Sequence, residues 1–327
     1  MSKKVLITGA SGFLGFHLIE AALAAGMEVH AGVRPSSDVA HLHHLEISIV
    51  NLDFRNVPAM AALLQEQQYS DIIHAAGATR AKNEAAFNEV NATYTENLLK
   101  AIVQSGIELN RFVYFSSLAA VGPKAYEAKW PEQDELSPAP VTLYGKSKLL
   151  AENLLKQYAQ IPWVVLRPTA IYGPRDKDLF VLFKTYGWRL EPYMGKGPQQ
   201  LSFVYVKDVA QAAICALNGQ IIHTCYDVSD GNSYDRYALA KVTKRLLGIR
   251  TLRIHMPLTL IRWIAVMAEA TSKGMPLLNR DRLNELTAQN WNCSIIRIQR
   301  ELGYQPDFSL EEGMRETLDW YTGNHWL

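Results

Sequence analysis

Cysteine is scarce in this sequence, and neither sign of charge is in clear excess. Only three cysteines occur among 327 residues, Cys215, Cys225 and Cys293, and they form no CxxC pair. A small, odd and widely spaced set argues against a disulfide-stabilised secreted domain and indicates a reducing compartment. The formal net charge of +1 gives no reason to expect nucleic acid or an anionic membrane as a partner.

Long apolar runs are also missing. The longest apolar helix candidate, at about 256–270, is interrupted by Arg262 and is shorter than the ~20 residues that a membrane span requires. We expect this helix to pack on its own domain, with shallow membrane contact as the alternative, and we expect no integral membrane segment. Only Met1–Lys4 precede the first apolar run, which leaves no room for a targeting peptide and makes the cytoplasm the expected compartment.

The rest of the composition is that of a globular protein with a full core. Of the 327 residues, 48% are hydrophobic and 20% are charged. Apolar runs alternate with stretches of helical periodicity, which predicts an α/β fold with a Rossmann-type, doubly wound parallel sheet. Strands are expected at 5–8, 28–33, 47–50, 71–74, 111–115 and 163–166, and helices at 13–25, 57–67, 83–104 and 144–158.

The alternation weakens in the second half of the chain. A strand followed by a helix is expected at 203–217 and one more strand at 225–228, whereas helical patterns dominate from Ser233 onward. We therefore expect two units, a dinucleotide-binding domain and a smaller, mostly helical C-terminal substrate lobe. The expected domain comprises residues 1–174 plus about 203–230, and the lobe comprises about 175–202 plus 231–327.

A glycine-rich loop connects the first expected strand to the first expected helix. Glycine in such a loop lets the backbone turn tightly and approach a pyrophosphate, whose charge the helix N-terminus stabilises. A glycine-rich turn without a ligand is the alternative, but the strand–loop–helix context favours dinucleotide binding. The residues expected at the cofactor are Gly9, Ser11, Gly12, Phe13, Leu14 and Gly15.

The second expected strand ends without an acidic residue. In NAD sites an Asp or Glu about 20 residues beyond the glycines binds the ribose 2′-hydroxyl. Here Val33 is followed by Arg34, and an arginine in this position is able to pair with a 2′-phosphate. The sequence therefore favours NADP, with NAD as the alternative cofactor. The alternative for Arg34 itself is a solvated arginine in a loop, without a role in cofactor binding.

Two further strand ends carry residues suited to a cofactor. Asp53 and Phe54 would lie near the adenine edge, although a turn-forming aspartate explains Asp53 nearly as well. His74, at the end of the fourth strand, is interpreted as a buried core histidine. The small residues after it, as contact with a cofactor requires, are Ala75, Ala76 and Gly77. No group of side chains has metal-ligand spacing, so no metal site is expected.

The strongest chemical pattern consists of Ser117, Tyr144 and Lys148. If the segment after Leu143 is helical, Tyr144 and Lys148 stand one turn apart on the same face. An ammonium beside a phenol favours phenolate and lowers a pKa that is otherwise about 10. Ser117 ends the fifth strand at the carboxyl edge, where its hydroxyl is able to hydrogen-bond a carbonyl. Beside a dinucleotide, these groups suit hydride transfer to or from a carbonyl.

Together, these motifs resemble those of the extended short-chain dehydrogenase/reductase family, also called the NAD-dependent epimerase/dehydratase family. The resemblance covers nearly the whole chain. The end of the second strand and the segment 117–123 are more similar to the dihydroflavonol reductase and 3β-hydroxysteroid dehydrogenase branches. The matching segments are 9–15, Asp53, 74–77, Ser117 with Gly122, Tyr144 with Lys148, 167–174, 203–209 and 302–306 through Trp320 and Tyr321.

The resemblance implies a role for each residue of the triad. Tyr144 would exchange a proton with the substrate oxygen, and Ser117 would position the carbonyl. Lys148 would hold the nicotinamide ribose and lower the tyrosine pKa. Pro168 and Ile171 would lie along the nicotinamide.

The resemblance also bears on assembly and on subfamily. It implies a homodimer formed through the helices at 83–104 and 144–158. Sugar-nucleotide 4,6-dehydratases carry an Asp–Glu pair where Leu118 and Ala119 stand here, so dehydration of a sugar nucleotide is not expected.

The sequence therefore predicts an NADP(H)-dependent oxidoreductase that interconverts a carbonyl and an alcohol of a small-molecule substrate. One alternative is an NAD-dependent nucleotide-sugar epimerase, which uses the same triad but is disfavoured by Arg34. A second alternative is a non-catalytic NADP-sensing protein on the same fold, which would have no need of a tuned acid/base.

Overall fold

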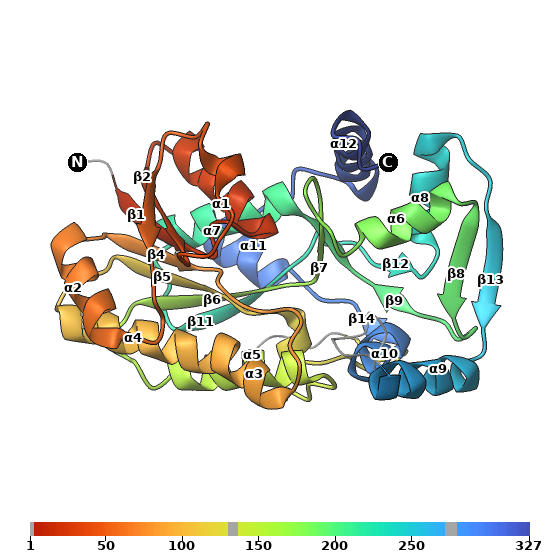
Figure 1. Cartoon of the computed structure of the whole chain (residues 1–327), viewed down its shortest axis with the longest axis horizontal. Coiled ribbons are helices and arrows are strands. Elements are labelled where there is room, and N and C mark those ends of the chain that lie inside the picture. The colour runs from red at the N-terminus through yellow and green to blue at the C-terminus, as the bar shows by residue number, and fades with distance from the viewer. Residues whose placement is uncertain (1–2, 130–136, 272–279) are drawn as a thin grey trace.

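The protein is built on a seven-stranded parallel sheet. The computed structural model describes residues 3–129, 137–271 and 280–327. The strand order is β11-β6-β5-β4-β1-β2-β3, and every neighbouring pair is parallel (Figure 1). The order reverses between β1 and β4, where open α/β sheets bind their ligands. The strands are β1 (Lys4–Thr8), β2 (Glu28–Val33), β3 (Ser48–Asn51), β4 (Asp71–His74), β5 (Arg111–Phe115), β6 (Trp163–Pro168) and β11 (Thr224–Val228).

Helices cover both faces of this sheet (Figure 1). One core cluster joins a face of the sheet to α1 (Phe13–Ala24), α7 (Val206–Asn218) and α11 (Ile296–Leu302). A second cluster joins the other face to α2 (Val57–Gln67), α4 (Tyr94–Ser105) and α5 (Leu143–Leu155). The inner strands of the sheet are rich in buried apolar residues, which is why their apolar runs could be located from the sequence. The predicted fold class is confirmed.

The prediction of one continuous helix at 83–104 is wrong, because the segment is divided into three elements. The segment consists of α3 (Glu84–Asn88), a π-helical turn η2 (Glu89–Thr93) and then α4. Within η2, Asn91 is fully buried, and its side chain exchanges hydrogen bonds of 2.7 and 3.0 Å with the backbone of Ala78. This distant contact accompanies the widened turn, and helical periodicity does not encode it.

The remainder of the chain contains more strand than the sequence indicated. β7 (Ala170–Tyr172) pairs with β10 (Phe203–Tyr205), and β8 (Leu190–Met194) pairs with β13 (Leu252–Met256). β9 (Gln200–Leu201) lies between β12 (Tyr234–Asp235) and β14 (Asn290–Trp291). These strands have two to five residues, and so short a run does not separate a strand from a helix. The helices of this part are α6 (Phe180–Gly187), α8 (Ala238–Leu247), α9 (Leu258–Thr271), α10 (Arg280–Thr287) and α12 (Leu310–Gly323).

A third core cluster stabilises this part of the molecule. It combines aromatic and aliphatic side chains of β7, α6, β10, α8 and α12, among them Tyr172, Phe183, Tyr205, Leu239 and Met314. The division of the chain into a dinucleotide-binding domain and a substrate lobe, with the boundaries given above, stays a prediction.

Helix α9 corresponds to the apolar helix expected at 256–270. Among the side chains of α9 that the structure describes, Ile261 packs inward and is 1% exposed, whereas Leu260, Trp263 and Ile264 are 48%, 63% and 41% exposed. Among the helices that the structure describes, none has both the length and the apolar character needed to cross a bilayer.

Candidate active site

The glycine loop lies directly against the end of β4. Gly9 has a φ of +72°, and a Cβ placed on it would lie 2.7 Å from backbone atoms of Ala75 and Ala76. Any larger residue would therefore push the two strand ends apart. The register that pairs Thr8 with His74 produces this contact, and the structure thereby brings together two of the expected cofactor segments.

The N-terminus of α1 is left open toward solvent. Gly12 is its N-cap, no side chain accepts a hydrogen bond there, and the first turn contains no acidic residue. A Cβ on Gly15 would lie 2.1 Å from the Gly9 carbonyl oxygen, so glycine is required for the helix to begin this close to the loop. Uncapped N–H groups with no acid nearby fit the diphosphate of a dinucleotide. Ser11 lies partly buried in the same turn.

Buried hydrogen bonds fix the segment after β4. The Thr8 hydroxyl and His74 Nδ1 are 2.7 Å apart, His74 Nε2 and the Thr95 hydroxyl are 2.9 Å apart, and the Ala76 N–H donates to Thr8 at 3.2 Å. Burial lowers the pKa of His74 to about 3, so the imidazole is neutral. The interpretation of His74 as a buried core histidine is confirmed.

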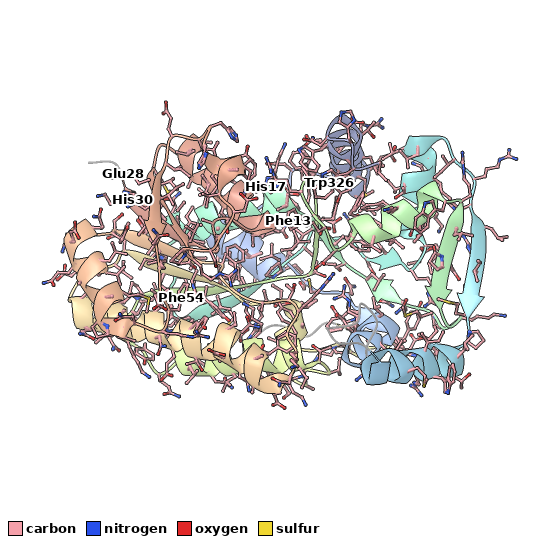
Figure 2. All side chains as sticks on the ribbon, in the orientation of Figure 1. Phe13, His17, Glu28, His30, Phe54 and Trp326 are labelled. Atoms are coloured by element: carbon pink, nitrogen blue, oxygen red, sulfur yellow. The ribbon has the colours of Figure 1, made fainter. Side chains whose placement is uncertain are left out.

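Two residues of the loop, Phe13 and Leu14, connect it to the C-terminal part of the chain. Both are partly buried and pack against the third core cluster. Figure 2 shows Phe13 at the end of α1 that lies nearer to Trp326 and α12. These two side chains anchor the loop, so the loop backbone and Ser11 are the groups that are able to contact a ligand.

The strand ends β2 and β3 carry the other expected adenosine contacts. Arg34 is exposed two residues beyond Gly32, which pairs with Thr8, so it lies at the same sheet edge as the glycine loop. Asp53 is exposed and accepts a hydrogen bond of 3.0 Å from the Arg55 N–H, which is the turn-forming role given above as the alternative. The ring of Phe54 is 7% exposed and stacks on Tyr94 with the ring centroids 5.7 Å apart.

Ser117 and Tyr144 lie close enough at the carboxyl edge of the sheet for the Ser117 hydroxyl to act on the pKa of Tyr144. Ser117 begins a short 3-10 helix η3 (Leu118–Ala120), and Tyr144 lies in the first turn of α5, where the Thr142 hydroxyl accepts the Gly145 N–H at 2.9 Å. A Cβ on Gly145 would lie 2.2 Å from the Ala119 carbonyl oxygen. Glycine at 145 is therefore what allows α5 and η3 to approach until the two hydroxyls meet.

Lys148 lies one turn further along α5 and is 4% exposed. Its Nζ donates to the Phe115 carbonyl at 2.7 Å and lies 3.4 Å from the Tyr114 hydroxyl. A Cβ on Gly77 would lie 3.2 Å from this Nζ. The lysine thus joins α5 to the end of β5 and to the small-residue segment after β4.

The electrostatics differ from the sequence expectation. Burial raises the pKa of Tyr144 to about 12, an effect that the hydrogen bond to Ser117 partly offsets and the carboxylate of Glu285 reinforces. Burial also lowers the pKa of Lys148 to about 8, against the attraction of Glu152. The pKa of the phenol is therefore raised and not lowered in this state, because loss of hydration outweighs the effect of the Ser117 hydroxyl.

Two buried residues that the sequence analysis did not single out form hydrogen bonds with residues on or near α5. Asn91 donates to the Ser147 hydroxyl at 2.9 Å, and its Oδ1 lies 3.1 Å from a Cβ placed on Gly77. Glu152, 1% exposed, accepts hydrogen bonds of 3.0 and 2.6 Å from the Arg167 guanidinium. The only sequence signal was an asparagine inside a predicted helix, where that residue is unfavourable.

The C-terminal part of the chain contacts the loop that follows Gly122. Asn290 donates its side-chain amide to the carbonyls of Ala125, Tyr126 and Ala128 at 3.2, 3.4 and 3.0 Å. This holds the described part of the loop after Gly122 against β14. Pro168 ends β6, where it pairs with Val228 of β11, and Ile171 in β7 is partly buried between two core clusters.

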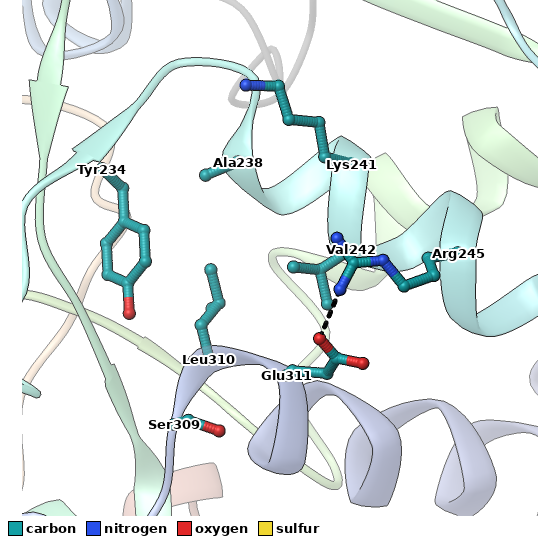
Figure 3. Close-up of a pocket in the computed structure, with 8 residues that line it drawn as sticks. All are labelled: Tyr234, Ala238, Lys241, Val242, Arg245, Ser309, Leu310 and Glu311. Carbon is teal, nitrogen blue, oxygen red and sulfur yellow. Dashed lines mark hydrogen bonds and ion pairs between the residues drawn. The ribbon is translucent and has the colours of Figure 1, made fainter.

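A pocket elsewhere on the molecule does not include these residues. It lies between α8 and the start of α12, has a volume of about 300 Å³, and is spanned by an ion pair of 2.6 Å between Arg245 and Glu311 (Figure 3). None of its lining residues belongs to the glycine loop or to the Ser117, Tyr144 and Lys148 group.

The chain is similar to known proteins over nearly its whole length. The chain is similar to 3 beta-hydroxysteroid dehydrogenase type 7 of Mus musculus, with 27% identity over an alignment of 354 positions that spans 96% of this chain and 94% of that protein. It is similar to a ceramide reductase of Caulobacter vibrioides, with 25% identity over an alignment of 328 positions that spans 99% and 96% of the two chains. The structure of a UDP-glucose 4-epimerase from Thermotoga maritima has the same fold, with a TM-score of 0.80, 20% identity and coverage of 98% and 99%.

The family assignment rests on the part of the chain that contains every expected site residue. The model of the NAD dependent epimerase/dehydratase family matches residues 5–223, from β1 to the segment just before β11. The chain therefore belongs to the NAD dependent epimerase/dehydratase family, the enzymes of the extended short-chain dehydrogenase/reductase type.

Proposed function

We propose that this protein interconverts a carbonyl and an alcohol with NADP(H), using Ser117, Tyr144 and Lys148. The observation that carries the proposal is the close approach of α5 to η3, which places Tyr144 beside Ser117 at the carboxyl edge of the sheet, with Lys148 one helical turn away. The names of the two sequence relatives, a hydroxysteroid dehydrogenase and a ceramide reductase, denote this class of reaction.

In the reductive direction, the Ser117 hydroxyl donates a hydrogen bond to the substrate carbonyl oxygen. Tyr144 keeps its proton at neutral pH because burial raises its pKa to about 12, and it gives this proton to the same oxygen as the alcohol forms. The charge of Lys148 stabilises the phenolate that is left. When bound, NADP(H) supplies or accepts the hydride, and the expected loop and strand-end residues, with Pro168 and Ile171, would hold it.

Replacement of Tyr144 tests the reaction. With NADPH and a panel of ketones and aldehydes that includes sterols and long-chain carbonyls, Tyr144→Phe is expected to lower kcat at least about 100-fold and to leave the Kd for NADPH within about twofold, because only the proton donor is lost. Tyr158→Phe, a partly buried tyrosine beyond the end of α5, is the matched control and should behave as wild type. Unchanged turnover in Tyr144→Phe would refute the assignment.

The cofactor preference is tested at Arg34. Because a guanidinium at the end of β2 is the expected partner of a 2′-phosphate, Arg34→Asp should shift the ratio of kcat/KM for NADPH and NADH toward NADH by at least about tenfold. An unchanged ratio would contradict the NADP proposal. Tightly retained NAD in freshly purified protein, with no net oxidation of NADPH, would instead favour the nucleotide-sugar epimerase.

A further inference from the structure

The small sheet formed by β8 and β13 has an apolar outer face. Leu190 pairs with Leu252 and Pro192 pairs with Ile254, so these four residues share one face. Leu252 is 66% exposed, Leu190 39% and Ile254 38%. A sheet with one solvated face normally presents polar side chains to the solvent. Here the arrangement is inverted, and apolar side chains of the described residues are exposed on the outer face.

Polar and aromatic contacts on the inner face fix this orientation. Glu191, 1% exposed, accepts hydrogen bonds from Lys244 at 2.6 Å, Thr251 at 2.6 Å and Arg253 at 3.1 Å. The Arg253 guanidinium lies 4.2 Å from the centroid of the Tyr237 ring. Turning the sheet over would break this network and leave a buried carboxylate without partners. The apolar face is therefore held outward.

Helix α9 follows β13 in the chain and exposes apolar side chains of its own. Leu260, Trp263 and Ile264 are 48%, 63% and 41% exposed, and their i, i+3, i+4 spacing places them on one side of the helix. Trp188, between α6 and β8, is 64% exposed with the Lys184 Nζ 5.7 Å from its ring centroid. Figure 1 shows β8, β13 and α9 at one end of the molecule, remote from β2 and β3.

Positive charge is concentrated in the same part of the chain. Residues 180–194 and 238–271 contain 8 of the 33 Lys and Arg residues but only 2 of the 32 Asp and Glu residues, which leaves 25 basic and 30 acidic residues elsewhere. Arg189, Arg250 and Arg262 are exposed, and no acidic side chain in the described part of the protein pairs with them. The overall charge of +1 is thus the sum of a positive charge in these two segments and a negative charge in the rest of the chain.

We propose that this surface, here called the lobe tip, docks on an anionic lipid bilayer. Its apolar side chains would enter the headgroup region while the surrounding arginines contact lipid phosphates. A second copy of the chain fits less well, because a two-fold interface would set the same basic surface against itself. The proposal does not depend on the reaction proposed above. The lobe tip consists of Trp188, Leu190, Leu252, Ile254, Leu260, Trp263 and Ile264, with Arg189, Arg250 and Arg262.

Co-sedimentation of the full chain with unilamellar vesicles tests the proposal. Vesicles of phosphatidylcholine with about 30% phosphatidylglycerol should bind the protein, whereas pure phosphatidylcholine should bind it at least about tenfold more weakly, and binding should fall as salt is raised above about 0.1 M. The double variant Leu252→Ser/Trp263→Ser should bind at least about tenfold more weakly because it removes apolar area, and Arg189→Gln/Arg250→Gln should lose about fivefold per charge.

Ile296→Ser is the matched control, because Ile296 is 70% exposed on α11 outside the lobe tip. It should bind vesicles as wild type does. Spin-labelled lipid should quench the tryptophan fluorescence of the wild-type protein. The quenching should be weaker in the variant Trp263→Phe. The proposal would be overturned by equal binding to neutral and anionic vesicles or by no binding to either. It would also be overturned if the lobe-tip variants lost a dimer but still bound vesicles.

Discussion

Lys148 is the residue whose protonation we expect to limit activity at alkaline pH. Burial lowers its pKa to about 8, so it is an ammonium below this pH and a neutral amine above it. Tyr144, with a pKa raised to about 12, keeps its proton over the same range. For carbonyl reduction, kcat/KM should therefore be level below pH 8 and decline toward tenfold per pH unit above it.

Two lysines on α5 allow this prediction to be checked. Lys148→Met should lower kcat/KM at least about 100-fold and remove the decline above pH 8, because no charge is then lost. Lys146→Met is the control, since Lys146 is exposed on the same helix and should keep both the rate and the profile. A decline that persists in Lys148→Met would assign the titration to another group.

The positions of Ser117, Tyr144 and Lys148 could be predicted because they depend on local rules. A four-residue spacing on a helix and the carboxyl edge of a parallel sheet are both readable from sequence. Burial is not readable in this way, and this is why the expected direction of the Tyr144 pKa shift was wrong. The support from Asn91 and the approach of Glu285 depend on contacts between distant segments, which no local pattern in the sequence carries.

At the scale of elements, the contact between α5 and η3 gives a direct prediction. A Cβ on Gly145 would lie 2.2 Å from the Ala119 carbonyl oxygen, so Gly145→Ala must push the two elements apart and separate Ser117 from Tyr144. We expect kcat to fall about 10- to 100-fold. The Tm should also fall, because the backbone has to shift.

Gly187→Ala is the matched control for this change. Gly187 ends α6, and a Cβ there would meet no atom within 4 Å. The substitution should leave kcat unchanged and be neutral or stabilising by up to about 1 kcal/mol. Equal kinetics of the two variants would show that the tight approach of α5 and η3 does not position the hydroxyls.

The elements themselves were predictable to different degrees. Strands β2, β4 and β5 and helix α2 begin and end where the sequence placed them, because buried apolar runs and one amphipathic period define them. The π-helical turn around Asn91 and the strands β8 and β13 were not predicted. In β13, apolar residues alternate with Arg253 and His255, yet the apolar side faces outward, so alternation alone does not tell which face is buried.

At the scale of the whole molecule, we propose that the protein is a homodimer formed through α4 and α5. Val103 on α4 and Leu150 on α5 are 46% and 40% exposed, which leaves apolar side chains on this face. Light scattering after gel filtration should give twice the chain mass, and Leu150→Glu should give the mass of one chain, because a charge would be buried. Ile296→Glu, on the opposite face of the sheet, should stay dimeric. A wild-type monomer would contradict the proposal.

The central position of β9 in its three-stranded sheet governs how this chain could be divided. Its residues Gln200 and Leu201 pair on one side with Tyr234 and Asp235 and on the other with Asn290 and Trp291. The segment before α7 that contains β9 and the segment after β11 that contains β12 and β14 thus form one sheet. A chimera that exchanges only the last third of the chain with a relative would leave β9 without matching neighbours. Grafting this part of the protein therefore requires both segments to be exchanged together.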